Sequence, residues 1–425
     1  MESSALTLLF AASLLSSIAV KFWLATRQMR HVVAHRHEVP AAFAQKISLQ
    51  AHQKAADYTL AKGRFSLLGM AFSAAVLLGW TLLGGLDLLN LIAREAVQSR
   101  WGTMAYQLAL IAAFTTVGGI LELPFDLYST FRLEQRFGFN RMTWRLYLRD
   151  TAMNLLMGIF IGLPIAALIL WIMGATGSLW WLWAWCAWMT INLVGMVIYP
   201  LFISPLYNKF EPLADESLKG RVQALMQRCG FTAKGFFVMD GSKRSAHSNA
   251  YFTGLGTAKR VVFFDTLLSS LSPDEMEAVL AHELGHFKHK HVAKRIGSMF
   301  VISLGGFALL GWLSTQSWFF TSLGVQPSLR APNDALALLL FLMVIPVFGF
   351  FISPLFAQLS RKHEFQADAY ACAQTDGRNL AAALLKLYED NASTLTPDPL
   401  YVRFYYSHPP ASERIAALTL AASPS

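Results

Sequence analysis

The stretch AMNLLMGIFIGLPIAALILWIMG, residues 152–174, contains no Asp, Glu, Lys or Arg. About 18 or more apolar residues are enough to cross a bilayer as a helix. Six further stretches are predominantly apolar, with at most one charged residue in each, at 5–26, 66–93, 104–125, 178–203, 297–315 and 333–354. We therefore predict a multi-pass α-helical membrane protein with seven transmembrane helices. The composition excludes a soluble enzyme, since 55% of the residues are hydrophobic and only 14% are charged.

The basic residues predict how the chain is oriented in the bilayer. Lys and Arg of short loops remain on the cytoplasmic side of a membrane. Segments 27–64 and 126–150 are rich in Lys and Arg, whereas the alternating loops are poor in them. This pattern predicts an external N-terminus and a cytosolic C-terminus. It also accounts for the net charge of +9 without a nucleic-acid partner, because the charges flank spans and form no single recognition stripe.

Two segments outside the predicted spans hold nearly all of the candidate chemistry. Two spans lie between them, so we expect both on the cytoplasmic face. In the first, aromatic and β-branched runs predict a small β-sheet, at 235–240, 248–254 and 259–265. We divide the chain into four parts. Residues 1–204 contain helices one to five, and residues 205–296 form a zincin-like domain with the sheet. Residues 297–354 contain helices six and seven, and residues 355–425 form a C-terminal segment.

The run HELGH, residues 282–286, predicts a metal site on a helix. The sequence Ser-Pro-Asp-Glu from Ser272 is a capping box that marks where this helix begins. His282 and His286 are one turn apart, so their imidazoles lie on one face, about 6 Å apart along the axis, and can share one ion. In H-E-x-x-H sites the intervening glutamate, here Glu283, is the general base, and zinc lowers the pKa of its water to about 7. We therefore expect one Zn²⁺ per chain.

A second motif, SRKHEFQADAYA at 360–371, can complete this site. A catalytic zinc needs a third protein ligand and an open position for water. Glu364 can supply the ligand, and Asp368, on the same helical face, can accept the N–H of a ligand imidazole. His363 is a rival ligand, but it points about 100° away from Glu364 and has no acid four residues on.

Two further histidines follow the HELGH run. His289 lies about 10 Å along the helix from His282, too far for both rings to bind one zinc ion at about 2 Å. His291 is turned away from the ligand face. We expect His289 and His291 to belong, with Lys288 and Lys290, to a basic collar beside the lipid headgroups.

Taken together, these motifs resemble the integral-membrane zinc CAAX proteases, the type I prenyl-protein endopeptidases. The resemblance extends in family order over nearly the whole chain through LPFDLYSTFRLEQRFGFNRMT (123–143), ISPLYNKFEPL (203–213), SAHSNAYFTG (245–254) and SHPPASERI (407–415). It implies seven helices enclosing a chamber, with zinc at the cytoplasmic end. It also implies the zinc ligands and the base at the positions derived above.

The resemblance implies four further functional residues. Asn249 and Ala250 match part of an edge strand along which the substrate lies, in agreement with the way a peptide adds to an open sheet edge. His408 matches a residue that stabilises the tetrahedral intermediate. Arg414 matches a supporting residue nearby.

We therefore expect a zinc metalloendopeptidase that cleaves peptide or protein substrates near the C-terminus, either prenylated CAAX-type or other membrane-associated proteins. The tail LTLAASPS has no lysine-based retrieval signal for the endoplasmic reticulum. We accordingly expect a bacterial member in the inner membrane with a cytoplasmic active site, and the endoplasmic reticulum membrane is the alternative. The alternative functions are a heat-shock-type membrane quality-control metalloprotease, and a zinc transporter or scaffold with a structural metal.

Overall fold

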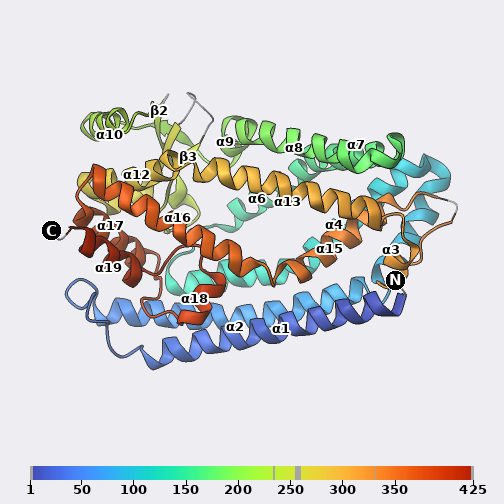
Figure 1. The fold of residues 1–425 in the computed structure, drawn as a ribbon, viewed down its shortest axis with the longest axis horizontal. Coiled ribbons are helices and arrows are strands. Elements are labelled where there is room, and N and C mark those ends of the chain that lie inside the picture. The colour runs from blue at the N-terminus through green and yellow to red at the C-terminus, as the bar shows by residue number, and fades with distance from the viewer. Residues whose placement is uncertain (1–2, 233–234, 254–259, 330, 423–425) are drawn as a thin grey trace.

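Long helices run side by side along the longest axis of the molecule, and the β-strands gather with shorter helices at one end (Figure 1). The structure, a computed structural model, describes residues 3–232, 235–253, 260–329 and 331–422. Its first helices are α1 (Ser3–Ala34), α2 (Leu49–Trp80), α3 (Gly85–Ala93), α4 (Ser99–Tyr128), α5 (Gln135–Phe137), α6 (Trp144–Met157), α7 (Leu163–Ala175), α8 (Trp180–Ile198) and α9 (Ser204–Tyr207). Short π-helical segments join α3 to α4, α4 to α5, α6 to α7, and α8 to α9.

The remaining helices lie either at the sheet end or in the long bundle (Figure 1). They are α10 (Glu216–Arg228), α11 (Asp265–Ser270), α12 (Pro273–Lys288), α13 (His291–Leu313), α14 (Ser317–Thr321), α15 (Asp334–Gly349), α16 (Ser353–Gln374), α17 (Gly377–Asp390), α18 (Pro399–Tyr405) and α19 (Ala411–Ala422).

Within the described residues, six helical runs are long and apolar enough to cross a membrane. A seventh is present if α15 and α16, which meet at a bend of 67°, are counted as one span. Large apolar side chains face outward on these runs: Phe160 is 70% exposed and Val301 is 72% exposed. Surfaces of this kind suit lipid rather than water. The predicted multi-pass membrane fold is therefore confirmed.

Two predicted span boundaries were wrong. The span expected at 66–93 ends at Trp80, because Gly84 adopts a left-handed conformation with φ of 77° and interrupts the helix. Residues 85–93 instead begin the next helical run. The span expected at 333–354 bends after Gly349, and α16 leaves the bend in a new direction.

The sheet has four strands in the order β1-β2-β4-β3. They are β1 (Phe210–Pro212), β2 (Gly235–Met239), β3 (Ala250–Thr253) and β4 (Arg260–Phe264). β2 and β4 are parallel, whereas the β1–β2 and β3–β4 pairs are antiparallel. Three strands match the predicted runs, and β1 was not predicted. Among the described strands β3 pairs only with β4, so it is an edge strand.

The helix α12 packs between the sheet domain and the C-terminal helices. Its predicted capping box is present, because Ser272 Oγ accepts from the Glu275 backbone N–H and the Ser272 N–H donates to the Glu275 carboxylate at 2.7 Å. The buried face of α12 includes Met276, Leu280 and Leu284, which join a core with residues of α10, β4 and α17. This core fixes the orientation of the helix that carries HELGH.

Candidate metal centre and active site

Helices α12 and α16 bring together the two histidines of HELGH and Glu364. Nε2 of His282 and Nε2 of His286 lie 3.3 Å apart. Oε2 of Glu364 lies 3.5 Å from Nε2 of His282, and Oε1 lies 3.4 Å from Nε2 of His286. Among the described residues, these three form the group of His, Cys, Asp and Glu side chains that could hold an ion, with all ligand atoms within 4.8 Å of one another.

This donor set fits a zinc ion. Ligand atoms at about 2.0–2.2 Å from tetrahedral zinc are about 3.3–3.6 Å apart, and the observed separations of 3.3, 3.4 and 3.5 Å fall in that range. Oε2 of Glu364 is also buried, and the nitrogens around it are Nδ1 of His408 at 2.8 Å and Nε2 of His282 at 3.5 Å. Such an oxygen is costly to bury unless a cation compensates it.

Asp368 and Arg414 hold His282 in place. Oδ1 of Asp368 lies 2.8 Å from Nδ1 of His282, and the guanidinium of Arg414 donates to both oxygens of Asp368. All three side chains are buried. Burial acts to lower the pKa of His282, but the hydrogen bonds to Asp368 and Glu364 outweigh it and hold that pKa above its ordinary value. The two carboxylates that raise this pKa make the potential at the site negative, which attracts a cation.

His291 is not part of a basic collar, and that prediction was wrong. Its side chain is buried, its Nδ1 lies 3.0 Å from Nδ1 of His286, and its Nε2 lies 2.9 Å from Oε1 of Gln366. The cause is local: Lys290 adopts a left-handed conformation with φ of 56°, which ends α12 and turns the first residue of α13 back toward the ligands.

His289 and His363 are not in the ligand group. The ring of His363 stacks on His291 with centroids 4.0 Å apart. His289 is exposed, with its ring centroid 5.5 Å from that of His291. Their exclusion as ligands agrees with the expectation from spacing.

Gly285 allows the two ligand helices to meet. A Cβ atom at this position would lie 2.9 Å from Cα of Ala367 and 3.1 Å from Cβ of Tyr370, both on α16. Helices that approach this closely tolerate only glycine at the contact. Sequence reasoning missed Gly285, His291 and Gln366. The signal for Gly285 was a glycine in a helix interior, where it costs about 1 kcal/mol unless packing requires it.

Glu283 is half-buried and makes no hydrogen bond or ion pair with the residues that the structure describes. A carboxylate left free beside the ligands is available to accept a proton. His408 lies on the other side of Glu364, with its Nδ1 2.8 Å from Oε2 and its side chain 64% exposed. The predicted neighbours Asp368, Arg414 and His408 therefore all lie around the three ligand groups.

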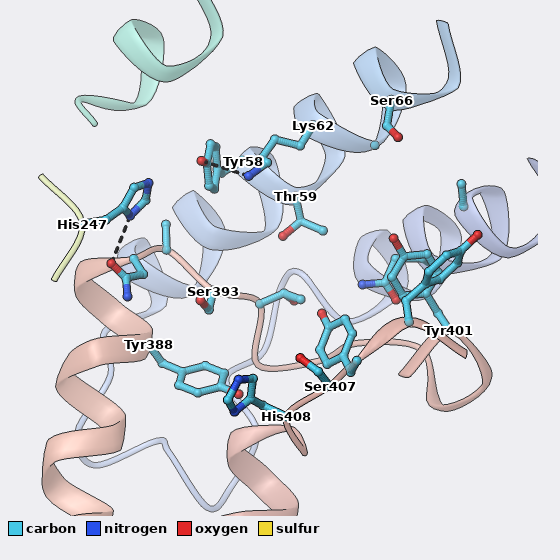
Figure 2. A pocket seen from close by; sticks show the side chains of 18 of the residues that line it. Tyr58, Thr59, Lys62, Ser66, His247, Tyr388, Ser393, Tyr401, Ser407 and His408 are labelled. Carbon is cyan, nitrogen blue, oxygen red and sulfur yellow. Dashed lines mark hydrogen bonds between the residues drawn. The ribbon is translucent and has the colours of Figure 1, made fainter. Parts of the chain in front are cut away.

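Asn249 and Ala250 lie where β3 begins. The Asn249 carbonyl accepts from the Phe264 N–H at 3.1 Å, which pairs this residue with β4. Asn249 and His408 line one cavity of about 920 Å³, whose other walls come from α1, α2 and the residues between α17 and α18. Figure 2 shows His408, Ser407 and Tyr388 at one side of this cavity and Lys62 and Tyr58 on α2 at another. Asn249, directly before the edge strand, and His408, which contacts Glu364, thus border the same space, whereas the three ligand residues are not part of its lining.

A membrane-spanning helical chain with two imidazoles and a carboxylate gathered beside a free glutamate has the features of a membrane metallopeptidase of the H-E-x-x-H class. Family comparison agrees. Residues 28–209 match the CAAX prenyl protease N-terminal model of five membrane helices, and residues 212–422 match peptidase family M48. The chain belongs to family M48 and, within it, to the integral-membrane CAAX prenyl proteases.

Relatives of this group match over most of their length. CAAX prenyl protease 1 of Saccharomyces cerevisiae is 35% identical over 90% of this chain and 88% of its own. The human CAAX prenyl protease 1 homolog is 31% identical over 96% of this chain and 95% of its own. The crystal structure of S. mikatae Ste24p superposes with a TM-score of 0.88 at 32% identity, covering 97% of this chain and 98% of that one. The chain is therefore an integral membrane metalloendopeptidase.

Proposed function

We propose that this protein is a zinc endopeptidase that cleaves near the C-terminus of prenylated CAAX-type proteins. The observation that carries the proposal is the convergence of His282, His286 and Glu364 within 4.8 Å, next to a Glu283 without a partner among the described residues. Zinc held by these three residues would supply Lewis acidity, which acidifies water and polarises the scissile carbonyl.

The protein's own residues would supply the proton transfers and the positioning. Glu283 takes a proton from the attacking water and returns it to the leaving amine, as a general base and then a general acid. His408 donates to the oxygen that becomes negative in the transition state. Asp368 accepts the Nδ1 proton of His282, and Arg414 fixes Asp368, so that Nε2 of His282 faces the ion.

Substrate would bind as an added strand. β3 is an edge strand among the described residues, and Asn249 and Ala250 lie at its beginning beside the cavity. Main-chain hydrogen bonds to such an edge hold a peptide extended without regard to its sequence. We propose that the cavity is part of a larger chamber between the helices, at whose cytoplasmic end the peptide is cut.

The prenylated CAAX substrate is favoured over general membrane quality control by the names of the relatives and by the match to five N-terminal membrane helices. A transporter or scaffold gains no support from them. These relatives come from eukaryotes, so they do not support the expected location in a bacterial inner membrane. They agree with the alternative location in the endoplasmic reticulum membrane. We propose a cytosolic active site in either membrane.

The proposal is tested by mass spectrometry of products from a farnesylated CAAX peptide and an unprenylated control of the same sequence. We expect the wild-type protein, in vesicles and in the presence of zinc, to release a short C-terminal peptide from the farnesylated substrate. Its kcat/KM for this substrate should be higher than for the unprenylated control. Equal cleavage of both peptides would refute the prenyl preference. Cleavage of neither would refute the proposed function.

A further inference from the structure

The cavity beside the candidate metal centre has an unusual charge pattern. Among its described lining residues there is no Asp or Glu, although two lysines, Lys21 of α1 and Lys62 of α2, are present. The other polar groups are mainly hydroxyls and amides, including several tyrosines. A cavity with cationic and neutral walls favours an anionic ligand.

The two lysines differ in what their ammonium groups contact. Lys62 donates to the Tyr58 hydroxyl at 3.3 Å, and that hydroxyl donates to the Glu134 carboxylate at 2.7 Å. Lys62 is thus linked to an anion outside the cavity lining. Lys21 makes no hydrogen bond or ion pair with the described residues, and its Nζ lies 4.8 Å from the centre of the Phe350 ring.

An unpaired ammonium in this place is costly. Lys21 lies on α1, one of the helices long and apolar enough to span the membrane, and α1 runs from Ser3 to Ala34. A charged side chain inside a membrane span is rare and usually marks a ligand or ion pathway. A ring face compensates a cation only in part, by about 0.5–2 kcal/mol. The cost is recovered if an anion binds to Lys21.

We propose that Lys21 binds the C-terminal carboxylate of the peptide substrate. The inference rests on the proposed function, because an enzyme that cuts near a C-terminus meets this charge in every substrate. His408, whose Nδ1 is 2.8 Å from Glu364, lines the same cavity as Lys21, so the cavity extends from Lys21 to a residue in contact with a candidate ligand. A peptide spans about 3.3 Å per extended residue, so a few residues beyond the cut can reach along the wall.

Lys21 is then a specificity-determining residue that sets how far from the C-terminus the peptide is cut. Its hydrogen bond to a carboxylate is charge-assisted, which makes it stronger than a bond between neutral groups. The resulting selectivity disfavours internal peptide segments and amidated chains. An edge strand that recognises only main chain does not provide this selectivity.

The test compares two farnesylated CAAX peptides of one sequence, one with a free C-terminal carboxylate and one with a C-terminal amide. Both are assayed with full-length protein in phosphatidylcholine vesicles, which offer no anionic headgroup as a competing ligand. For the wild type we expect KM to be about tenfold lower for the acid than for the amide. In Lys21→Met this preference falls to about one, through a higher KM for the acid, and Lys21→Arg restores most of it.

Lys62→Met is the matched control, because it removes the same charge from the same cavity. It should keep most of the acid preference, since Lys62 is already bonded to Tyr58. Cleavage of both peptides by the wild type with equal KM would overturn the inference and leave the proposed function intact. Loss of the preference in Lys62→Met but not in Lys21→Met would overturn the assignment to Lys21. A wild type that cleaves neither peptide contradicts the proposed function itself.

Discussion

At the scale of single residues, His291 carries the hydrogen bond that orients one of the two candidate imidazole ligands. If Nε2 of His286 faces the ion, its Nδ1 carries a proton and donates to Nδ1 of His291. Nε2 of His291 then carries a proton and donates to Oε1 of Gln366. Each ring nitrogen in this series of hydrogen bonds thus has one role, as donor or as acceptor. The series ends on a neutral amide, whereas the partner of His282 is the Asp368 carboxylate.

We expect His291→Ala to weaken zinc binding by about 10–100-fold, the usual effect of removing a partner of a metal-bound histidine. The change leaves the Nδ1 proton of His286 without an acceptor and frees the ring to rotate. Competition with a zinc chelator of known affinity measures the effect directly. His289→Ala is the control, since this exposed ring contacts neither ligand. Equal zinc affinities for the two variants would contradict the orienting role.

At the scale of elements, the site depends on how closely α12 approaches α16. Gly285 lies at the contact, where an added Cβ would come 2.9 Å from the α16 backbone at Ala367. The ligands His282 and His286 flank this point on one helix, and Glu364 lies one turn before Ala367 on the other. Separation of the helices therefore separates the ligands.

Gly285→Ala should destabilise the protein by about 1–3 kcal/mol, the usual cost of overpacking, and should lower zinc affinity. Thermal unfolding and zinc content of the purified variant provide the measurements. Gly220→Ala on α10 is matched to it, because nothing lies within 4 Å of an added Cβ there. That change should be neutral or stabilise by up to about 1 kcal/mol. If Gly285→Ala behaved like Gly220→Ala, close helix approach would not be what assembles the site.

Sequence patterns predicted elements better than the contacts between them. Long apolar runs, the capping box at Ser272 and the aromatic and β-branched runs of the strands are local signals, and the elements that they predict are present. The position of His291 was mispredicted because that prediction assumes a straight helix through this residue, whereas α12 ends at Lys288 and Lys290 takes a left-handed conformation. The end of α2 at Trp80 was missed for a similar reason, since Gly84 stops a helix inside an apolar run. Both errors arise from one residue whose backbone departs from helical geometry.

At the scale of the whole molecule, the membrane helices and the candidate site form one structure with a shared cavity. The cavity is bordered by α1 and α2 from the N-terminal bundle, by the edge strand at Asn249, and by His408 beyond α18. Residues more than three hundred positions apart in the sequence also contact each other, as in the hydrogen bond from Arg27 to Asp398. The cavity thus joins the N-terminal bundle to the residues around the candidate site.

The most direct test of the account is a joint measurement of zinc content and peptide cleavage for the wild type and Glu283→Gln. Because Glu283 makes no hydrogen bond or ion pair with the described residues and is not a ligand in the proposed site, the variant should fold and retain one zinc per chain. Without the base its cleavage rate should fall by about 10²–10⁴-fold. Zinc retained with cleavage lost is the predicted result. A variant that retains both zinc and the full rate of cleavage would contradict the proposed chemistry.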